Sequence, residues 1–123
     1  MCNQINIKIK KSRKFLELLL KGVDRRRKHD LYLASCYFSP DSAIKLISEI
    51  LNNNIKLESV FLYIDRRTAL AVGKIKLQDV CNRFTDLNVQ LFAVDSIGLF
   101  HTKAYAIISN DNDGIYRGSL IVG

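Results

Sequence analysis

The chain has 123 residues, 48% hydrophobic and 25% charged, a composition typical of a single soluble globular domain with one core. Its 19 basic and 12 acidic residues give a formal net charge of +7, which favours a polyanionic partner and above all nucleic acid. The three cysteines form no C-x-x-C pair, and no apolar run approaches the roughly 20 residues of a membrane span, so disulfide frameworks, zinc ribbons and membrane insertion are excluded. We therefore expect a cytoplasmic protein.

The first half of the sequence alternates predicted strands and helices. Residues 4–10 alternate apolar and polar side chains, which predicts a short edge strand or an extended arm, and a helix is expected over 13–21. Residues 31–38 form a continuous apolar run, typical of a strand that is buried on both faces. Pro40 then opens a second helix, whose apolar stripe extends to Leu51.

The densest positive run of the chain precedes the apolar run and consists of Arg25, Arg26, Arg27 and Lys28. One interpretation is a patch that contacts phosphates and positions a nucleic acid without reading its sequence. The alternative is a solvated loop or helix end.

The second half contains further strands and a second long helical pattern over 67–84, in which Gly73 favours a break. Strands are expected over 60–64, 89–94, 99–108 and 115–122, the last two as a hairpin around the turn 109–114. This order predicts an α/β layered domain with a mixed, largely parallel sheet flanked by helices and a C-terminal antiparallel hairpin.

A histidine and a lysine lie two positions apart in the predicted strand 99–108. Residues at i and i+2 of a strand share a face, so His101 and Lys103 would lie side by side with Tyr105 and could bind one anion. The alternative is an ordinary half-buried histidine beside a solvated lysine. The opposite face of this strand is expected to be the core face, formed by Phe100, Ala104, Ala106 and Ile108.

These segments resemble the phospholipase D superfamily, in its nuclease-like branch. His101-Thr102-Lys103 is similar to the H-x-K of the family's HKD motif, and residues 34–40 are similar to its first buried strand and turn. Residues 120–123 resemble the strand that enters the family's Gly-Ser-x-Asn motif, with Gly123 as its glycine; Gly118-Ser119 is an alternative match. Residues 1–123 are thus expected to form one phospholipase D-like domain, a truncated fragment of a longer polypeptide.

The resemblance implies hydrolysis of phosphodiesters through a phosphohistidine, without a metal or other cofactor. His101 would attack phosphorus, Lys103 would bind a non-bridging oxygen, and Gly123 and Ser119 are the candidate phosphate contacts. A second histidine must protonate the leaving oxygen, so the active site needs a homodimer or a second HKD-bearing segment, and the fragment alone is expected to be inactive. The basic composition favours DNA or RNA over lipid as the substrate. Of the two nucleic acids, DNA is the expected one.

One departure from the family leaves other functions open. The family's aspartate, five residues after the lysine, is replaced here by Ile108. This favours an alternative in which the chain is a non-catalytic nucleic-acid-binding or regulatory module that retains the fold. A generic α/β domain with a chance H-x-K is the third interpretation.

Overall fold

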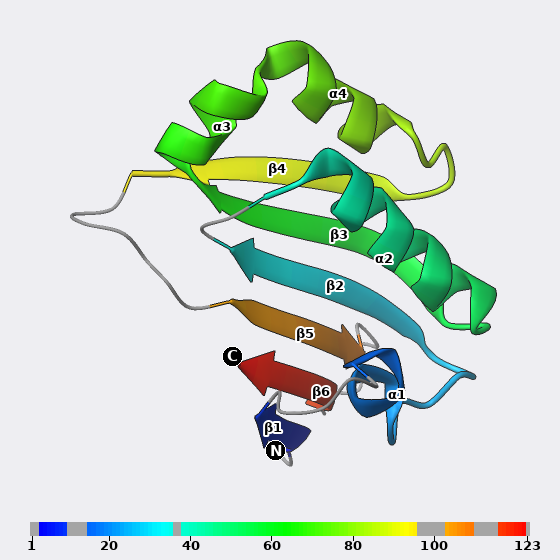
Figure 1. Cartoon of the computed structure of the whole chain (residues 1–123). Coiled ribbons are helices and arrows are strands. Elements are labelled where there is room, and N and C mark those ends of the chain that lie inside the picture. Colours follow the sequence, from blue (N-terminus) through cyan, green and yellow to red (C-terminus); the bar gives the residue numbers. More distant parts are fainter. Residues whose placement is uncertain (1–2, 10–14, 36–37, 96–102, 110–115, 123) are drawn as a thin grey trace.

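A computed structural model describes residues 3–9, 15–35, 38–95, 103–109 and 116–122, with only the backbone described for the first strand and for Tyr116 (Figure 1). Helices and strands alternate through most of this length, in an order close to that predicted from the sequence. The elements are β1 (Asn3–Ile9), α1 (Phe15–Leu20), β2 (Lys28–Ser35), α2 (Pro40–Asn52), β3 (Lys56–Asp65), α3 (Arg66–Val72), α4 (Lys74–Asn82), β4 (Asn88–Val94), β5 (Ala104–Ser109) and β6 (Tyr116–Val122).

The strands form one six-stranded sheet in the order β1-β6-β5-β2-β3-β4. Three neighbouring pairs are parallel, whereas β5 runs antiparallel to both β2 and β6. The sheet is therefore mixed and partly parallel, which confirms the predicted α/β class and the C-terminal hairpin. The short strand predicted near the N-terminus does lie at an edge, where β1 pairs with β6.

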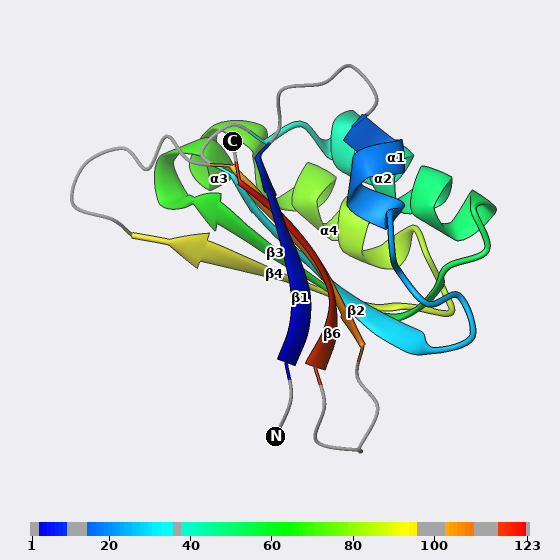
Figure 2. The same ribbon diagram turned by 90° about the horizontal axis from the view of Figure 1, so that it is seen from below.

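The four helices lie on one side of the sheet (Figure 2). Along β2, Leu31 and Leu33 are buried against this helical layer, whereas Tyr32 and Ala34 between them are only partly buried. The prediction that this strand is buried on both faces is therefore wrong, because no described element covers the second face. Instead, aromatic rings stack across the strands, with 5.0 Å between the ring centroids of Tyr32 and Phe61.

The core face of β5 is the opposite of the predicted one. Ile107 is completely buried in the hydrophobic core, and Tyr105 packs against that core with its ring 4.8 Å from the ring of Phe15 in α1. The physical reason is cross-strand pairing: Ile107 lies opposite Leu31 and Tyr105 lies opposite Leu33, and directly opposed residues share a face. Ala104, Ala106 and Ile108 consequently point to the face without helices.

Local signals set the helix boundaries as predicted. Ser39 caps α2, since its hydroxyl accepts a hydrogen bond of 3.4 Å from the backbone N–H of Ser42, and Pro40 fills the first helical turn. The long helical pattern of 67–84 is divided into α3 and α4 by Gly73, whose φ of 92° lies in the left-handed region that favours glycine.

A close approach between the two hairpin strands requires a glycine at position 118. A Cβ atom added to Gly118 would collide with the backbone carbonyl of Ile107 in β5. We expect Gly118→Ala to lower the free energy of unfolding by about 1–3 kcal/mol, because backbone atoms cannot move aside as flexible side chains do. Urea denaturation of both proteins measures the difference; an unchanged midpoint would show that β5 and β6 separate more easily than this contact implies.

Candidate functional site

The edge of the sheet at which β2 and β3 end is the candidate site. β5 is antiparallel to β2, so the residue before β5 lies at the same edge as the last residue of β2. The pairing of Ala34 with Ala104 puts Lys103 next to Ser35 along this edge. In open α/β sheets, ligands bind outside the carboxyl ends of the parallel strands, and this arrangement puts a lysine there.

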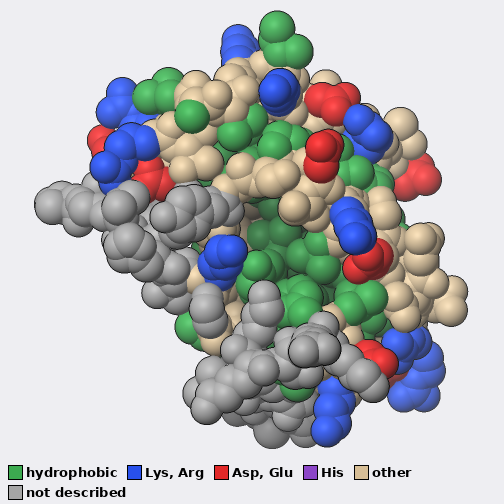
Figure 3. Space-filling view, viewed as in Figure 1, with side chains coloured by type: hydrophobic (Ala, Val, Ile, Leu, Met, Phe, Trp, Pro, Cys, Tyr) green, Lys and Arg blue, Asp and Glu red, His purple; other side chains and the backbone are tan. Residues whose placement is uncertain are grey.

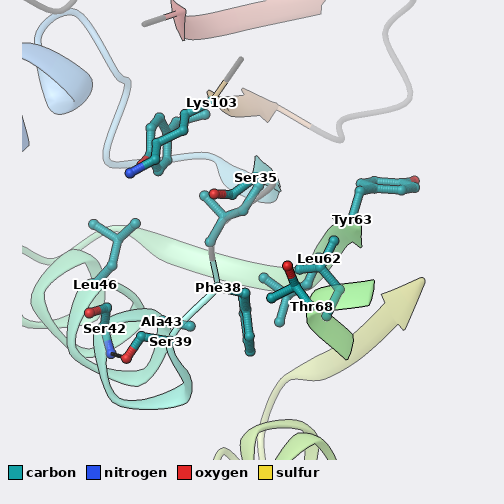
Figure 4. A pocket seen from close by; sticks show the side chains of 13 residues that line it. Ser35, Phe38, Ser39, Ser42, Ala43, Leu46, Leu62, Tyr63, Thr68 and Lys103 are labelled. Carbon is teal, nitrogen blue, oxygen red and sulfur yellow. Dashed lines mark hydrogen bonds between the residues drawn. The ribbon is translucent and has the colours of Figure 1, made fainter. Parts of the chain in front are cut away.

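A pocket of about 390 Å³ opens at this edge between the sheet and α2. Figure 3 shows a hollow floored by hydrophobic side chains, with both basic and acidic side chains around it. In Figure 4, Lys103 and Ser35 lie on one side of the pocket, and Ser42, Ala43 and Leu46 of α2 lie on the other. The polar residues that line the pocket are Lys103, Ser35, Ser39, Ser42 and Thr68.

The polar groups of the pocket suit an anion. Lys103 contributes an ammonium group, and the N-terminus of α2 contributes the positive end of a helix dipole. In the first turn of α2, Pro40 has no N–H group, and the N–H groups of Ser42 and Ala43 donate to the hydroxyl and the carbonyl of Ser39. The remaining walls are largely apolar, with Leu33, Leu62 and Phe38 among them. An ionic contact at this position is stronger than in open solvent, because apolar walls lower the local dielectric constant.

Tyr105 lines the same pocket as a packing residue. Burial raises the pKa of its hydroxyl above the ordinary value of 10.0. The hydroxyl therefore stays protonated at neutral pH, and Tyr105 supplies a neutral wall beside Lys103.

The structure describes only part of the predicted phosphodiesterase machinery. Lys103 lines the pocket, whereas His101 and Gly123 lie outside the described residues. Ser119, the alternative phosphate contact, is completely buried in β6, opposite Ile107. It does not line the pocket, so Lys103 is the one described member of the predicted set that does.

The basic run lies at the other end of the sheet. Lys28 begins β2 and Ser35 ends it, and a strand of eight residues separates its ends by about 23 Å. Arg26 is 91% exposed and forms an ion pair with Asp24, and Arg25 donates a hydrogen bond of 3.0 Å to the carbonyl of Asn53. The structure therefore does not bring the predicted nucleic-acid-binding residues together with Lys103.

Asp24 forms ion pairs with two arginines of this basic run, Arg26 and Arg27. Hydrogen bonds from the side chain and backbone of Arg26 lower the pKa of its carboxyl from 3.8 to about 2, and Arg27 lies 3.4 Å away.

We expect the Asp24 interaction to stabilise the fold above pH 3.8 and to be lost as the pH falls toward about 2, since a depressed carboxyl pKa favours the folded state only where the carboxyl is ionised. Asp24→Asn should therefore be less stable than the wild type at pH 7, and the two should converge near pH 2. Urea unfolding across this range measures the effect, which is small because the pair is exposed. Asp86→Asn, at another exposed aspartate, is the control.

One buried carboxylate at the candidate edge was missed by the sequence reasoning. Asp65 ends β3 and is 3% exposed; one of its oxygens accepts a hydrogen bond of 2.8 Å from the backbone N–H of Arg67 and so caps α3. Its other oxygen, Oδ2, is buried and has no hydrogen-bond partner in the described part of the chain. The sequence Asp65-Arg66-Arg67, directly after the predicted strand 60–64, is the signal that could have indicated this carboxylate. Asp65 does not line the pocket; its described contacts are the helix cap and an ion pair of 3.5 Å with the side chain of Arg67.

Other classes of site have little support in the described residues. Within the ranges that the structure describes, His, Cys, Asp and Glu side chains form no group of three or more that could hold a metal ion. None of the described helices is long and apolar enough to cross a bilayer. Burial raises the pKa of the Cys81 thiol above its ordinary value of 9.0, so the thiol is mostly protonated at neutral pH.

Comparison with known proteins adds no assignment: no family model, curated protein or solved structure matches this chain.

Proposed function

We propose that this chain is a phosphodiester hydrolase domain of the nuclease-like phospholipase D type, with Lys103 as the residue that binds the scissile phosphate. The observation that carries the proposal is the position of Lys103 in a pocket at the carboxyl edge of the parallel strands, opposite the N-terminus of α2. Both features attract an anion to the same cavity. The H-x-K pattern adds His101 as the nucleophile beside this lysine.

In the proposed reaction, a ring nitrogen of neutral His101 forms a bond to phosphorus, and the bond from phosphorus to the leaving oxygen breaks. Lys103 neutralises the charge that gathers on the non-bridging oxygens. A histidine from a second HKD-bearing segment protonates the leaving oxygen and then accepts a proton from the water that hydrolyses the phosphohistidine. The lysine supplies the positive charge at the phosphate, so the reaction requires no metal ion.

The proposed substrate is nucleic acid, with DNA favoured. The net charge of +7 supports a polyanion. The basic run from Arg25 to Lys28 lies about 23 Å from the pocket edge, a length that about seven base pairs of duplex span. We propose that this run contacts phosphates remote from the cleaved bond.

The second candidate is a nucleic-acid-binding module without catalysis. Ile108 stands where the family has its aspartate, and it lies in β5 opposite Asp30, on the face without helices and away from the pocket. Position 108 therefore contributes no carboxylate to the pocket. This favours the second candidate, a domain that binds phosphate but does not catalyse hydrolysis.

Covalent trapping separates the two candidates. The intact protein is mixed with radiolabelled single- and double-stranded DNA in the presence of EDTA, quenched in alkali and separated on a denaturing gel. A hydrolase gives labelled protein that is stable to alkali and labile to acid, as expected of phosphohistidine, together with cleaved DNA. If the protein binds DNA but forms no adduct and cleaves no DNA, the result supports the binding module. If it neither binds nor cleaves DNA, both candidate functions are wrong.

A further inference from the structure

We propose that the outer edge of β4 binds an extended segment of an acidic partner protein, which adds to the sheet as a further strand. β4 is the last strand on its side of the sheet and pairs with β3 alone among the described strands. Its outward backbone N–H and C=O groups are therefore available to another strand. This surface is separate from the pocket that contains Lys103, and the proposal does not depend on the phosphodiesterase function.

The sequence of β4 contains none of the features that normally protect an edge strand. Natural edges are blocked by charged side chains, by proline or by a bulge. The seven residues of β4 include no charged residue and no proline, and the register with β3 runs without interruption from Asn88 to Val94. Phe92 in the middle of the strand is 40% exposed, stacked on Tyr63 at a centroid distance of 5.1 Å.

A groove along this edge provides room for the side chains of an added strand. It has a volume of about 390 Å³, and its walls come from Leu91 of β4, from Ala69 and Leu70 of α3, and from Leu77 and Cys81 of α4. Leu70 is 71% exposed, a large apolar surface that an added strand would cover. Burial raises the pKa of the Cys81 thiol, so this side chain is also a neutral wall. The groove therefore suits an apolar side chain at alternate positions of the partner strand.

The shape of this edge favours a slender segment over a second copy of the chain. In Figure 1, α3 and α4 extend outward past β4. A second copy paired antiparallel about a two-fold axis would bring its own α3 and α4 over the same junction, and the two helix pairs would collide. A single strand needs only about 4.8 Å beside β4 and carries no helices of its own.

The charge of the α3–α4 segment sets the chemistry of the partner. Residues 66–83 contain five basic residues. Arg66, Arg67 and Arg83 are paired with Asp95, Asp65 and Asp79 at 3.5, 3.5 and 2.8 Å, so the positive charge of this segment that is not paired within the described part of the chain comes from Lys74 and Lys76. Lys74 lines the groove. Acidic residues on either side of an apolar strand would therefore be attracted to this edge, and the attraction should weaken as salt is added.

A synthetic peptide tests the proposal directly. The probe is a fluorescein-labelled peptide of alternating valine and threonine residues between pairs of glutamates, and its matched control carries N-methyl groups on the backbone nitrogens of all its valine and threonine residues, so that both edges of the peptide are blocked. We expect the probe to bind, with slowed amide hydrogen exchange confined to β4. The N-methylated peptide should bind at least about tenfold more weakly, because it cannot complete the strand ladder.

Two charge-matched variants test the location. Leu70→Glu puts a carboxylate in the groove and should weaken binding about tenfold or more, whereas Ile75→Glu, at an 84% exposed residue outside the groove lining, should leave it nearly unchanged. Both sites are exposed, so both variants should fold. The proposal is wrong if the probe does not bind, or if the N-methylated peptide binds as tightly as the probe. It is also wrong if the two variants weaken binding equally.

Discussion

Replacing His101 by alanine is expected to abolish hydrolysis and the alkali-stable DNA adduct, while Lys103→Ala should lower the rate of hydrolysis by about 10²–10³-fold. The two effects differ because the histidine forms the covalent bond, whereas the lysine stabilises the charge that develops at the phosphate. Lys103 lies at the rim of a preformed pocket, so its removal should leave the fold intact. The measurement is the initial rate of DNA cleavage by the intact protein with EDTA present.

A lysine elsewhere on the surface provides the control for charge. Lys45 lies on α2 and, among the residues that the structure describes, forms a long ion pair of 4.0 Å with Glu49. Lys45→Ala removes the same positive charge from the molecule. If general attraction of DNA were the whole role of Lys103, the two variants would lose activity equally. Unchanged turnover in His101→Ala or Lys103→Ala would refute the proposed mechanism.

Replacing Ile107 by alanine is expected to lower the free energy of unfolding by about 2–5 kcal/mol. Ile107 is completely buried in the core between the sheet and the helical layer, so the lost methyl and methylene groups leave a cavity there. Chemical denaturation, monitored by far-ultraviolet circular dichroism, measures the change. The loss is large for a domain of this size, whose total stability is typically about 5–15 kcal/mol.

The neighbouring residue Ile108 provides a matched control, because it is the same residue type on the opposite face of the same strand. Ile108 is only partly buried, so Ile108→Ala should cost less than about 1.5 kcal/mol. Equal losses in the two variants would indicate that the second face of the sheet is covered in solution. A larger loss at Ile108 would mean that the core face of β5 has been assigned the wrong way round.

Local patterns in the sequence predicted the elements because their causes are local. The cap at Ser39, the proline after it and the break at Gly73 act within one or two turns of helix. The face of β5 could not be predicted in this way. Apolar residues occupy both of its faces, and the decision depends on pairing with Leu31 and Leu33, far away in the sequence.

The candidate site was predictable only in part for the same reason. The H-x-K pattern identified Lys103, but Thr68 and Ser42 join it in the pocket through the arrangement of α3 and α2 around the sheet edge. The basic run looked equally suited to a phosphate when viewed as sequence. Its separation from the pocket follows from the direction of β2, which places Lys28 and Ser35 at opposite ends of one strand.

The pairing of β1 with β6 has a consequence for the order of folding. Asn3 is aligned with Tyr116, so β1 finds its partner only after residues 10–115 between the two strands have been synthesised. The β2–β3–β4 unit has its partners nearby in sequence and can assemble earlier on the ribosome. Docking of β1 is thus the step with the highest entropic cost of loop closure, and it should be the last to acquire protection in a kinetic refolding experiment.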